Sequence, residues 1–159
     1  MSTASKHSVS LRDALPGLVP SLRAYARSLS RNPHHADDLV QEALTKALSA
    51  EAQWQEGTDA RAWVFTILRR CWLMGLRRGK REMPWDEARY ATTAAAEKLS
   101  LTDLARAMDA LPAVQREALM LVAAQGMSIA EAAAICDVAQ GTIKARISRG
   151  RAALRILLA

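Results

Sequence analysis

The last third of the sequence constrains the fold most strongly, because its pattern predicts three successive helices, of which the last is strongly positive. Ser128 and Glu131 form an S-x-x-E capping box that predicts a helix start, and residues 136–138 provide a turn after that helix. No acid follows Asp137. The last helix, expected to begin near residues 139–142, carries five bases: Lys144, Arg146, Arg149, Arg151 and Arg155. Two helices joined by a short turn, the second one positive, are typical of a helix-turn-helix that binds nucleic acid.

The rest of the chain also favours helices, and no segment alternates as a strand would. The predicted fold class is therefore all-α, with two small helical domains joined by a flexible linker. In the first predicted helix, Pro16, Gly17 and Pro20 predict an early break, and Gly79 predicts the end of the third. In the last helix, the apolar stripe Ile143, Ile147, Leu154 and Leu158 is expected to face inward. The predicted helices cover residues 11–29, 34–50, 60–78, 100–111, 112–126 and 128–136, and a last one runs almost to the end.

Composition divides the chain into four parts. Residues 1–10 are polar and predict a loose tail, and residues 11–82 predict the first domain. Residues 83–98 contain a proline, many small residues and three acids against two bases, so they predict a linker. Residues 99–159 predict the second domain, which carries the helix-turn-helix. The sequence leaves open whether the two domains are compact against each other.

The net charge of +6 is distributed unevenly along the chain. Residues 61–81 hold seven bases and no acid, and the last helix holds the second basic cluster. Two basic clusters in different domains favour two contacts with a polyanion. The alternative is that both clusters are only solvated helix faces.

One face of the helix predicted over residues 60–78 combines an aromatic ring, a hydroxyl and cations. Trp63, Thr66, Arg70 and Arg77 are spaced so that they share that face. Such a combination suits unpaired bases beside phosphates. The alternative is that Trp63 only completes the hydrophobic core.

Enzyme, metal and membrane functions are not predicted. His34, His35, Asp37 and Asp38 point in different directions around one helical turn, and the two acids fit the first turn of a helix, so neither metal nor cofactor is expected. No phosphate loop, nucleophile elbow or zinc spacing is present. Cys71 and Cys136 are far apart in apolar helical segments and are expected to be buried thiols in a reducing compartment. The first ten residues lack a signal sequence, and no apolar run is long enough for a membrane span, so a cytoplasmic protein is expected.

Taken together, two groups of motifs resemble the extracytoplasmic-function (ECF) group of bacterial sigma factors. In the second half, residues 111–112, 115–117, 126–128, 131–133 and 141–146 resemble sigma region 4. In the first half, residues 36–43 (ADDLVQEA) resemble region 2.2, and residues 62–69 (AWVFTILR) resemble region 2.3 onwards. The sequences of residues 37–42, 65–69 and 115–119 are similar to those of the general-stress-response branch of this group, the EcfG type.

The resemblance implies a promoter-specificity subunit that directs core RNA polymerase to start transcription. The implied −35 contacts are Arg116, Gln140, Thr142, Lys144, Arg146, Ser148, Arg149 and Arg151. The implied −10 contacts are Trp63, Thr66, Arg69, Arg70, Arg77 and Arg78, assisted by the loop of residues 54–59. The implied polymerase-binding residues are Asp37, Asp38, Leu39, Gln41 and Glu42.

The implied partners are promoter DNA, the β′ clamp helices and β flap of core RNA polymerase, and a small anti-sigma factor of the NepR type. Two alternatives remain at the level of sequence. A sigma-like decoy would sequester an anti-sigma factor without binding DNA, but it would not need the bases of the last helix. A repressor that binds DNA without polymerase would not explain the polar face of residues 37–42 or the bases of residues 61–81.

Overall fold

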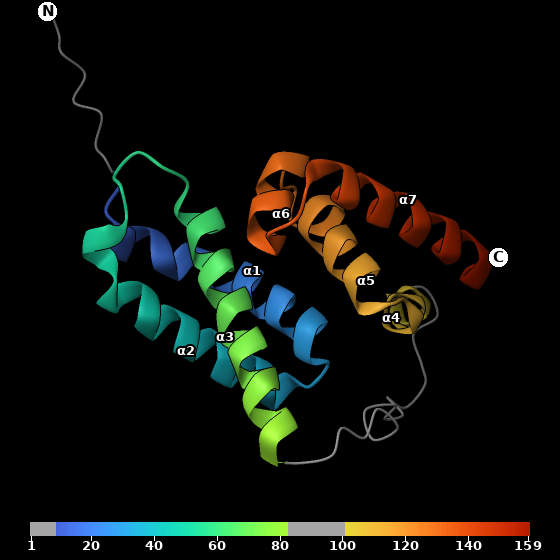
Figure 1. The fold of residues 1–159 in the computed structure, drawn as a ribbon, viewed down its shortest axis with the longest axis horizontal. Helices are drawn as coiled ribbons and strands as arrows, with labels where there is room; N and C mark the ends of the chain where they lie inside the picture. Colours follow the sequence, from blue (N-terminus) through green and yellow to red (C-terminus); the bar gives the residue numbers. More distant parts are fainter. Residues whose placement is uncertain (1–8, 83–100) are drawn as a thin grey trace, which may run out of the picture.

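The computed structural model describes residues 9–82 and 101–159, and every regular element within them is helical, which confirms the all-α prediction. Figure 1 shows α1 to α3 as one group and α4 to α7 as a second group beside it. The linker predicted over residues 83–98 lies outside the described residues, as does most of the predicted tail. In chain order the elements are α1 (Leu11–Ser30), α2 (Pro33–Ser49), η1 (Glu51–Gln53), α3 (Ala60–Glu82), α4 (Leu101–Ala110), α5 (Ala113–Leu119), η3 (Met120–Ala124), α6 (Ile129–Cys136) and α7 (Gln140–Leu157).

The first group is built around two stacked aromatic rings. Tyr25 of α1 and Phe65 of α3 are both fully buried, with ring centroids 5.0 Å apart and planes 10° from parallel. Such pairs add to the free energy gained from burying their area. Leu22, Val40 and Leu68 complete the core between the three helices.

Helix α1 is continuous from Leu11 to Ser30, so the predicted break at Pro16, Gly17 and Pro20 is wrong. Both prolines are exposed, while Leu11 and Leu15 are buried on the opposite side of the helix. Each proline removes one backbone hydrogen bond, and the two carbonyls left without that donor belong to Arg12 and Pro16, which are both exposed. Burial of the inner face therefore outweighs the local cost of the prolines.

The start of α2 and the end of α3 can be compared with the helix bounds predicted from proline and glycine. Pro33 occupies the first helical position of α2, one residue before the predicted start at residue 34, and Asn32 caps it by accepting hydrogen bonds from the amides of His34 and His35 at 3.0 and 3.2 Å. Helix α3 continues through Gly79 to Glu82, so the predicted stop is wrong. A glycine inside a helix costs only about 1 kcal/mol, which does not by itself end one.

The second group contains the predicted helix-turn-helix. The Ser128 and Glu131 capping box that starts α6 is confirmed, with reciprocal hydrogen bonds of 3.0 and 2.8 Å. Asp137, in the left-handed conformation at φ 55°, ends α6 and turns the chain into α7. Upstream, α5 continues into the π-helical turn η3, and Gly126 at φ 67° makes the turn towards α6.

Helix α7 buries the first part of its predicted apolar stripe only. Ile143 and Ile147 are buried and Leu154 is half-buried, but Leu158 is exposed, so its predicted inward position is wrong. The end of α7 extends beyond the helices that cover its first turns (Figure 1).

The two groups pack against each other rather than standing apart. Helix α3 contacts α6, and α1 contacts α5 and η3. In the part of the chain that is described, no helix is long and apolar enough to cross a membrane.

Candidate nucleic-acid interface

Helix α7 presents most of the predicted −35 residues to solvent, because Ile143 and Ile147 fix which side of the helix faces the core. Thr142 and Arg146 are half-buried. The exposed members of the predicted set on this helix are Gln140, Lys144, Ser148, Arg149 and Arg151. These side chains provide amide, hydroxyl and guanidinium groups, which are the groups that read base edges and bind phosphates in a major groove.

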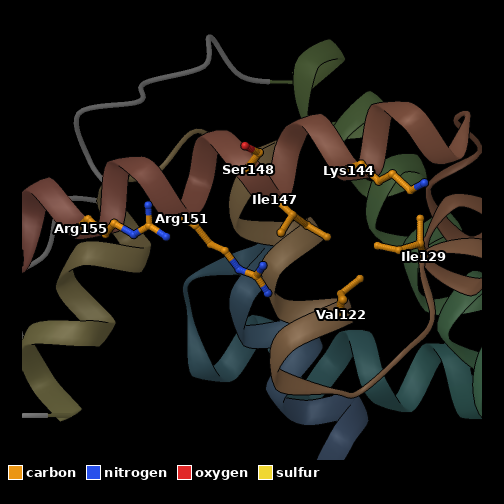
Figure 2. A pocket seen from close by; sticks show the side chains of 7 residues that line it. All are labelled: Val122, Ile129, Lys144, Ile147, Ser148, Arg151 and Arg155. Atoms are coloured by element: carbon orange, nitrogen blue, oxygen red, sulfur yellow. The ribbon is translucent and has the colours of Figure 1, made fainter.

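A groove of about 360 Å³ runs along one side of α7. Figure 2 shows the side chains of Lys144, Arg151 and Arg155 on the groove side of the helix. Val122 and Ile129 form the opposite wall, and neither was among the residues singled out from the sequence. The groove therefore combines apolar walls with cations, and it suits a partner that has both acidic and apolar groups.

The predicted −10 residues on α3 divide into exposed and half-buried ones. Arg70, Arg77 and Arg78 are exposed. Trp63 is half-buried and packs against the core, so the alternative in which this ring completes the core describes part of its surface. The hydroxyl of Thr66 is half-buried too, and it donates a hydrogen bond to its own helix at the carbonyl of Ala62, 2.9 Å away.

The predicted polymerase-binding residues of α2 lie on one exposed side of the helix, with one exception. Asp38 and Gln41 are exposed, and Asp37 lies 3.5 Å from the guanidinium of Arg23. Leu39 is the exception, because only 4% of it is exposed and it belongs to the core of the first group. The last member, Glu42, takes part in ion pairs of its own.

Two cations approach Glu42. The ammonium of Lys46 lies 3.1 Å away on the same helix, and the guanidinium of Arg78 lies 4.0 Å away on α3. The hydrogen bond to Glu42 raises the pKa of Lys46. Both pairs are exposed and contribute little to stability, so they do not prevent another partner from binding the carboxylate.

A cluster of polar side chains that the sequence did not indicate lies between the two helix groups. Glu117 in α5 is 6% exposed, and its carboxylate accepts hydrogen bonds from two residues of the first group. The Tyr25 hydroxyl donates at 2.6 Å and the Arg69 Nε at 2.7 Å, with Nη2 of the same guanidinium at 3.5 Å. The predicted −10 residue Arg69 is therefore bound by the second group, and 17% of its side chain is exposed.

The pKa values of this cluster are shifted by burial and by Glu117. Burial raises the pKa of Tyr25 well above 10.0, and the nearby Glu117 carboxylate adds to the shift. Burial, then Glu117, raises the pKa of the Cys136 thiol from 9.0 to about 12. Burial opposes the charge on Arg69, but the hydrogen bond and the charge of Glu117 outweigh it, so the pKa of Arg69 rises. At neutral pH the phenol and the thiol are therefore neutral, and the guanidinium is charged.

The predicted −35 residue Arg116 also lies between the groups. It is 6% exposed, and its Nε donates to the carbonyl of Ser28 in α1 at 3.0 Å. Its Nη1 donates to the carbonyls of Leu111 and Asp109 at 3.3 and 3.4 Å. Burial lowers the pKa of Arg116, and the neighbouring Arg31 adds to the shift. The structure therefore separates Arg116 from the exposed side chains of α7.

Comparison with known proteins identifies the family to which this architecture belongs. The family model "Sigma-70, region 4" matches residues 101–154, and "Sigma2 domain of PhyR" matches residues 16–69. The ECF RNA polymerase sigma factor EcfG of Rhodopseudomonas palustris is 46% identical over 154 residues, which cover 94% of this chain and 85% of that protein. The chain belongs to the ECF sigma factors.

Solved structures agree with this assignment for the ECF sigma factor. The sigma factor RpoE of Bartonella quintana, solved in complex with the anti-sigma factor NepR, is 40% identical with a TM-score of 0.78, covering 92% of this chain and 95% of that one. CnrH, solved with the cytosolic domain of CnrY, is 28% identical with a TM-score of 0.70, covering 93% and 86%. Because each superposition covers more than nine tenths of this chain, it includes both helix groups.

In this ECF sigma factor, the residues that bind across the two helix groups have only a weak signal in the sequence, and they were not predicted from it. Glu117 lies three residues after Val114 and four before the buried Leu121, so an acid occupies the apolar side of its helix. Tyr25 likewise lies within the apolar stripe of α1. A polar group at an inward position needs a partner, but the sequence does not say which one. Within the described residues, no group of three or more His, Cys, Asp or Glu side chains is arranged to hold a metal ion.

Proposed function

We propose that this ECF sigma factor is the promoter-specificity subunit that binds core RNA polymerase and starts transcription at promoters with −35 and −10 elements. The observation that carries the proposal is the 46% identity to an ECF RNA polymerase sigma factor over 94% of the chain. The exposed cations of α7, on a capped helix-turn-helix, supply the chemistry that duplex recognition needs. We propose residues 11–82 and 99–159 as its two domains, with residues 83–98 as the linker.

The second domain is proposed to bind the −35 element as duplex DNA. The N-terminal part of α7 enters the major groove, and the arginines bind guanine edges or phosphates. Arg116 can join this surface only after the second group has moved away from Ser28. The proposed set is Arg116, Gln140, Thr142, Lys144, Arg146, Ser148, Arg149 and Arg151.

The first domain is proposed to capture the melted −10 element. The exposed arginines of α3 bind the phosphates, and the outer surface of Trp63 stacks on a base. Arg69 contributes only when it is released from Glu117. The proposed set is Trp63, Thr66, Arg69, Arg70, Arg77 and Arg78.

Helix α2 is proposed to dock on the β′ clamp helices of core RNA polymerase, and the second domain on the β flap. The polar side of α2 supplies Asp37, Asp38, Gln41 and Glu42, while the buried Leu39 holds the helix in position from below. Acidic and amide groups on an exposed helix face suit a positively charged partner helix.

The regulatory partner is proposed to be a small anti-sigma factor of the NepR type, because the Bartonella quintana relative was solved with NepR. The regulated genes are proposed to be stress-response genes, as expected for the EcfG type. We place the protein in the cytoplasm, where core polymerase works, and expect neither enzymatic activity of its own nor a cofactor. The decoy alternative is less well supported, since the match over nearly the full chain is to a sigma factor.

The direct test is transcription in vitro with purified core enzyme and a panel of promoters. We expect RNA from promoters of the stress-response type only when the protein is present. If no template gave RNA with the protein present, although the same core enzyme was active with another sigma factor, the proposed function would be wrong.

Asp38→Arg tests the docking surface of α2. We expect the variant to lose core-polymerase binding, measured by co-elution without DNA, because the reversed charge repels a basic partner. Glu56→Arg is the matched control, since it makes the same change at an exposed position in the loop before α3. Co-elution of the Asp38 variant at the wild-type level would remove this side of α2 from the proposed interface.

A further inference from the structure

Several contacts between the two helix groups use residues that the proposed function assigns to DNA. Arg69 of the −10 set binds Glu117, and Arg116 of the −35 set binds the carbonyl of Ser28. Next to them, the guanidinium of Arg61 donates to the carbonyl of Gln125 at 2.6 Å. In this packed arrangement, called closed below, contacts within the chain therefore occupy two of the cations proposed to bind DNA and a third cation beside them.

Glu117 is the centre of these contacts. Its side chain is 7% exposed, and its hydrogen-bond donors Tyr25 and Arg69 both belong to the first group. A buried carboxylate without donors is strongly unfavourable. The closed arrangement thus depends on three side chains that come from α1, α3 and α5 and that meet only when the groups are in contact.

We propose that Glu117, Tyr25 and Arg69 form an intramolecular latch that holds the sigma factor closed and keeps two of its proposed DNA-binding cations, Arg69 and Arg116, occupied. The link to transcription rests on the proposed function, whereas the conformational part of the proposal does not. Opening breaks the contacts of Arg69, Arg61 and Arg116 across the boundary together, and Arg116 then keeps only its hydrogen bonds within the second group.

The latch is reversible for a physical reason. A buried ion pair offsets the desolvation of its own charges only in part, so water regained on opening compensates for much of the lost contact. Phosphates and the polymerase offer Arg69 and Arg61 alternative partners. Binding of DNA and core enzyme therefore competes directly with the latch.

The two native thiols report on the latch in the full-length protein. Cys136 is buried close to Glu117 and Arg69, whereas Cys71 is buried within the first group, near Lys46 and Glu42. We would measure the iodoacetamide labelling rate of each thiol by mass spectrometry in the wild type, Glu117→Gln and Arg69→Gln. Glu51→Gln is the matched control, because its ion pair with Arg12 at 3.1 Å lies within one group.

We expect both latch variants to label Cys136 at least about tenfold faster, because a hydrogen bond to a charged buried group shifts an equilibrium by about 10- to 100-fold. Cys71 and the Glu51→Gln control should keep wild-type rates. Arg69→Gln separates opening from electrostatics. Arg69 lowers the pKa of Cys136, so its loss alone would leave less thiolate and slow the labelling.

Two outcomes would overturn the latch. One is a wild-type Cys136 rate in both variants. The other is an equal acceleration of Cys71 and Cys136, which would mean that Glu117 only supports the fold.

Tyr25→Phe tests the functional part, because it removes one hydroxyl, keeps the stacked ring and replaces none of the proposed DNA or polymerase residues. We expect this variant to bind core enzyme several-fold more tightly than the wild type. Unchanged affinity would overturn the inhibitory role of the latch. If the wild type bound no core enzyme while the labelling pattern was as expected, the proposed function would fail and the latch would stand.

Discussion

At position 150 the helix α7 approaches α5 so closely that only a glycine hydrogen fits. A Cβ there would lie 2.8 Å from Cδ1 of Leu119, a buried side chain, and 3.5 Å from Cβ of Gln115. The sequence pattern around Gly150 predicted a cationic helix and offered no reason for a small residue. The requirement arises from the partner helix, which the pattern of one helix does not specify.

Gly150→Ala should therefore be less stable than Gly75→Ala. Gly75 lies inside α3 with nothing within 4 Å of an added methyl group, so alanine there gains about 1 kcal/mol of helix propensity. At position 150 the same gain is opposed by overpacking of about 1–3 kcal/mol. Urea unfolding of the two variants measures the difference. Equal free energies of unfolding would show that Leu119 moves aside without cost.

At the scale of elements, helix starts were predicted from the sequence more accurately than helix breaks and helix ends. The start of α6 was predicted correctly because Ser128 and Glu131 satisfy backbone groups within one turn. The breaks expected at Pro16 and Gly79 were wrong because helix continuation there depends on burial of the opposite face and on a modest propensity cost. A hydrogen bond between neighbouring residues can be predicted from the sequence. Whether burial of one helix face outweighs the local cost of a proline or a glycine cannot, because it depends on tertiary packing.

Helix α7 carries a prediction at the same scale. Arg149 is exposed and does not line the groove, so Arg149→Ala should weaken binding of reconstituted holoenzyme to a promoter with an intact −35 element by about 1–3 kcal/mol. The loss should shrink on a template with a scrambled −35 element. Arg155→Ala, more than one turn further along, is the control with a smaller expected effect. Unchanged promoter affinity would remove Arg149 from the proposed contacts.

At the scale of the whole molecule, the sequence predicted two helical units but not their contact. Tyr25 and Glu117 are 92 residues apart, and neither helix pattern points to the other. Arg69 and Arg116 were expected to bind DNA because they are cations in the matching motifs. The structure places them between the units, since a buried acid and free carbonyls lie within their reach.

The free energy of unfolding should fall in alkaline solution, because Cys136, close to Glu117 and Arg69, has a raised pKa in the folded protein. The pKa of Cys136 is 9.0 ordinarily and about 12 in the folded protein, so between these values the folded state holds more protons than the unfolded state. Its contribution is complete below about pH 9 and is lost as the pH rises towards 12, by at most about 1.4 kcal/mol per pH unit. The raised pKa of Tyr25 acts in the same direction at higher pH.

Urea unfolding at several pH values between about 8 and 10.5 checks this, with Cys136→Ala as the comparison. The variant should start from a lower stability, because a buried side chain is truncated, but lose less as the pH rises. Parallel curves for the two proteins would contradict the assigned shift.

The π-helical turn η3 between α5 and α6 has a consequence for how the second unit tolerates change in its length. A π turn holds one residue more than the α-helical turn it replaces, so it takes up an extra residue while the side chains beyond it keep nearly the same direction around the axis. Met127 is buried just after this point. Deleting one residue within Met120–Ala124 should therefore convert the segment into an ordinary α-helical turn and leave the later side chains close to their present positions.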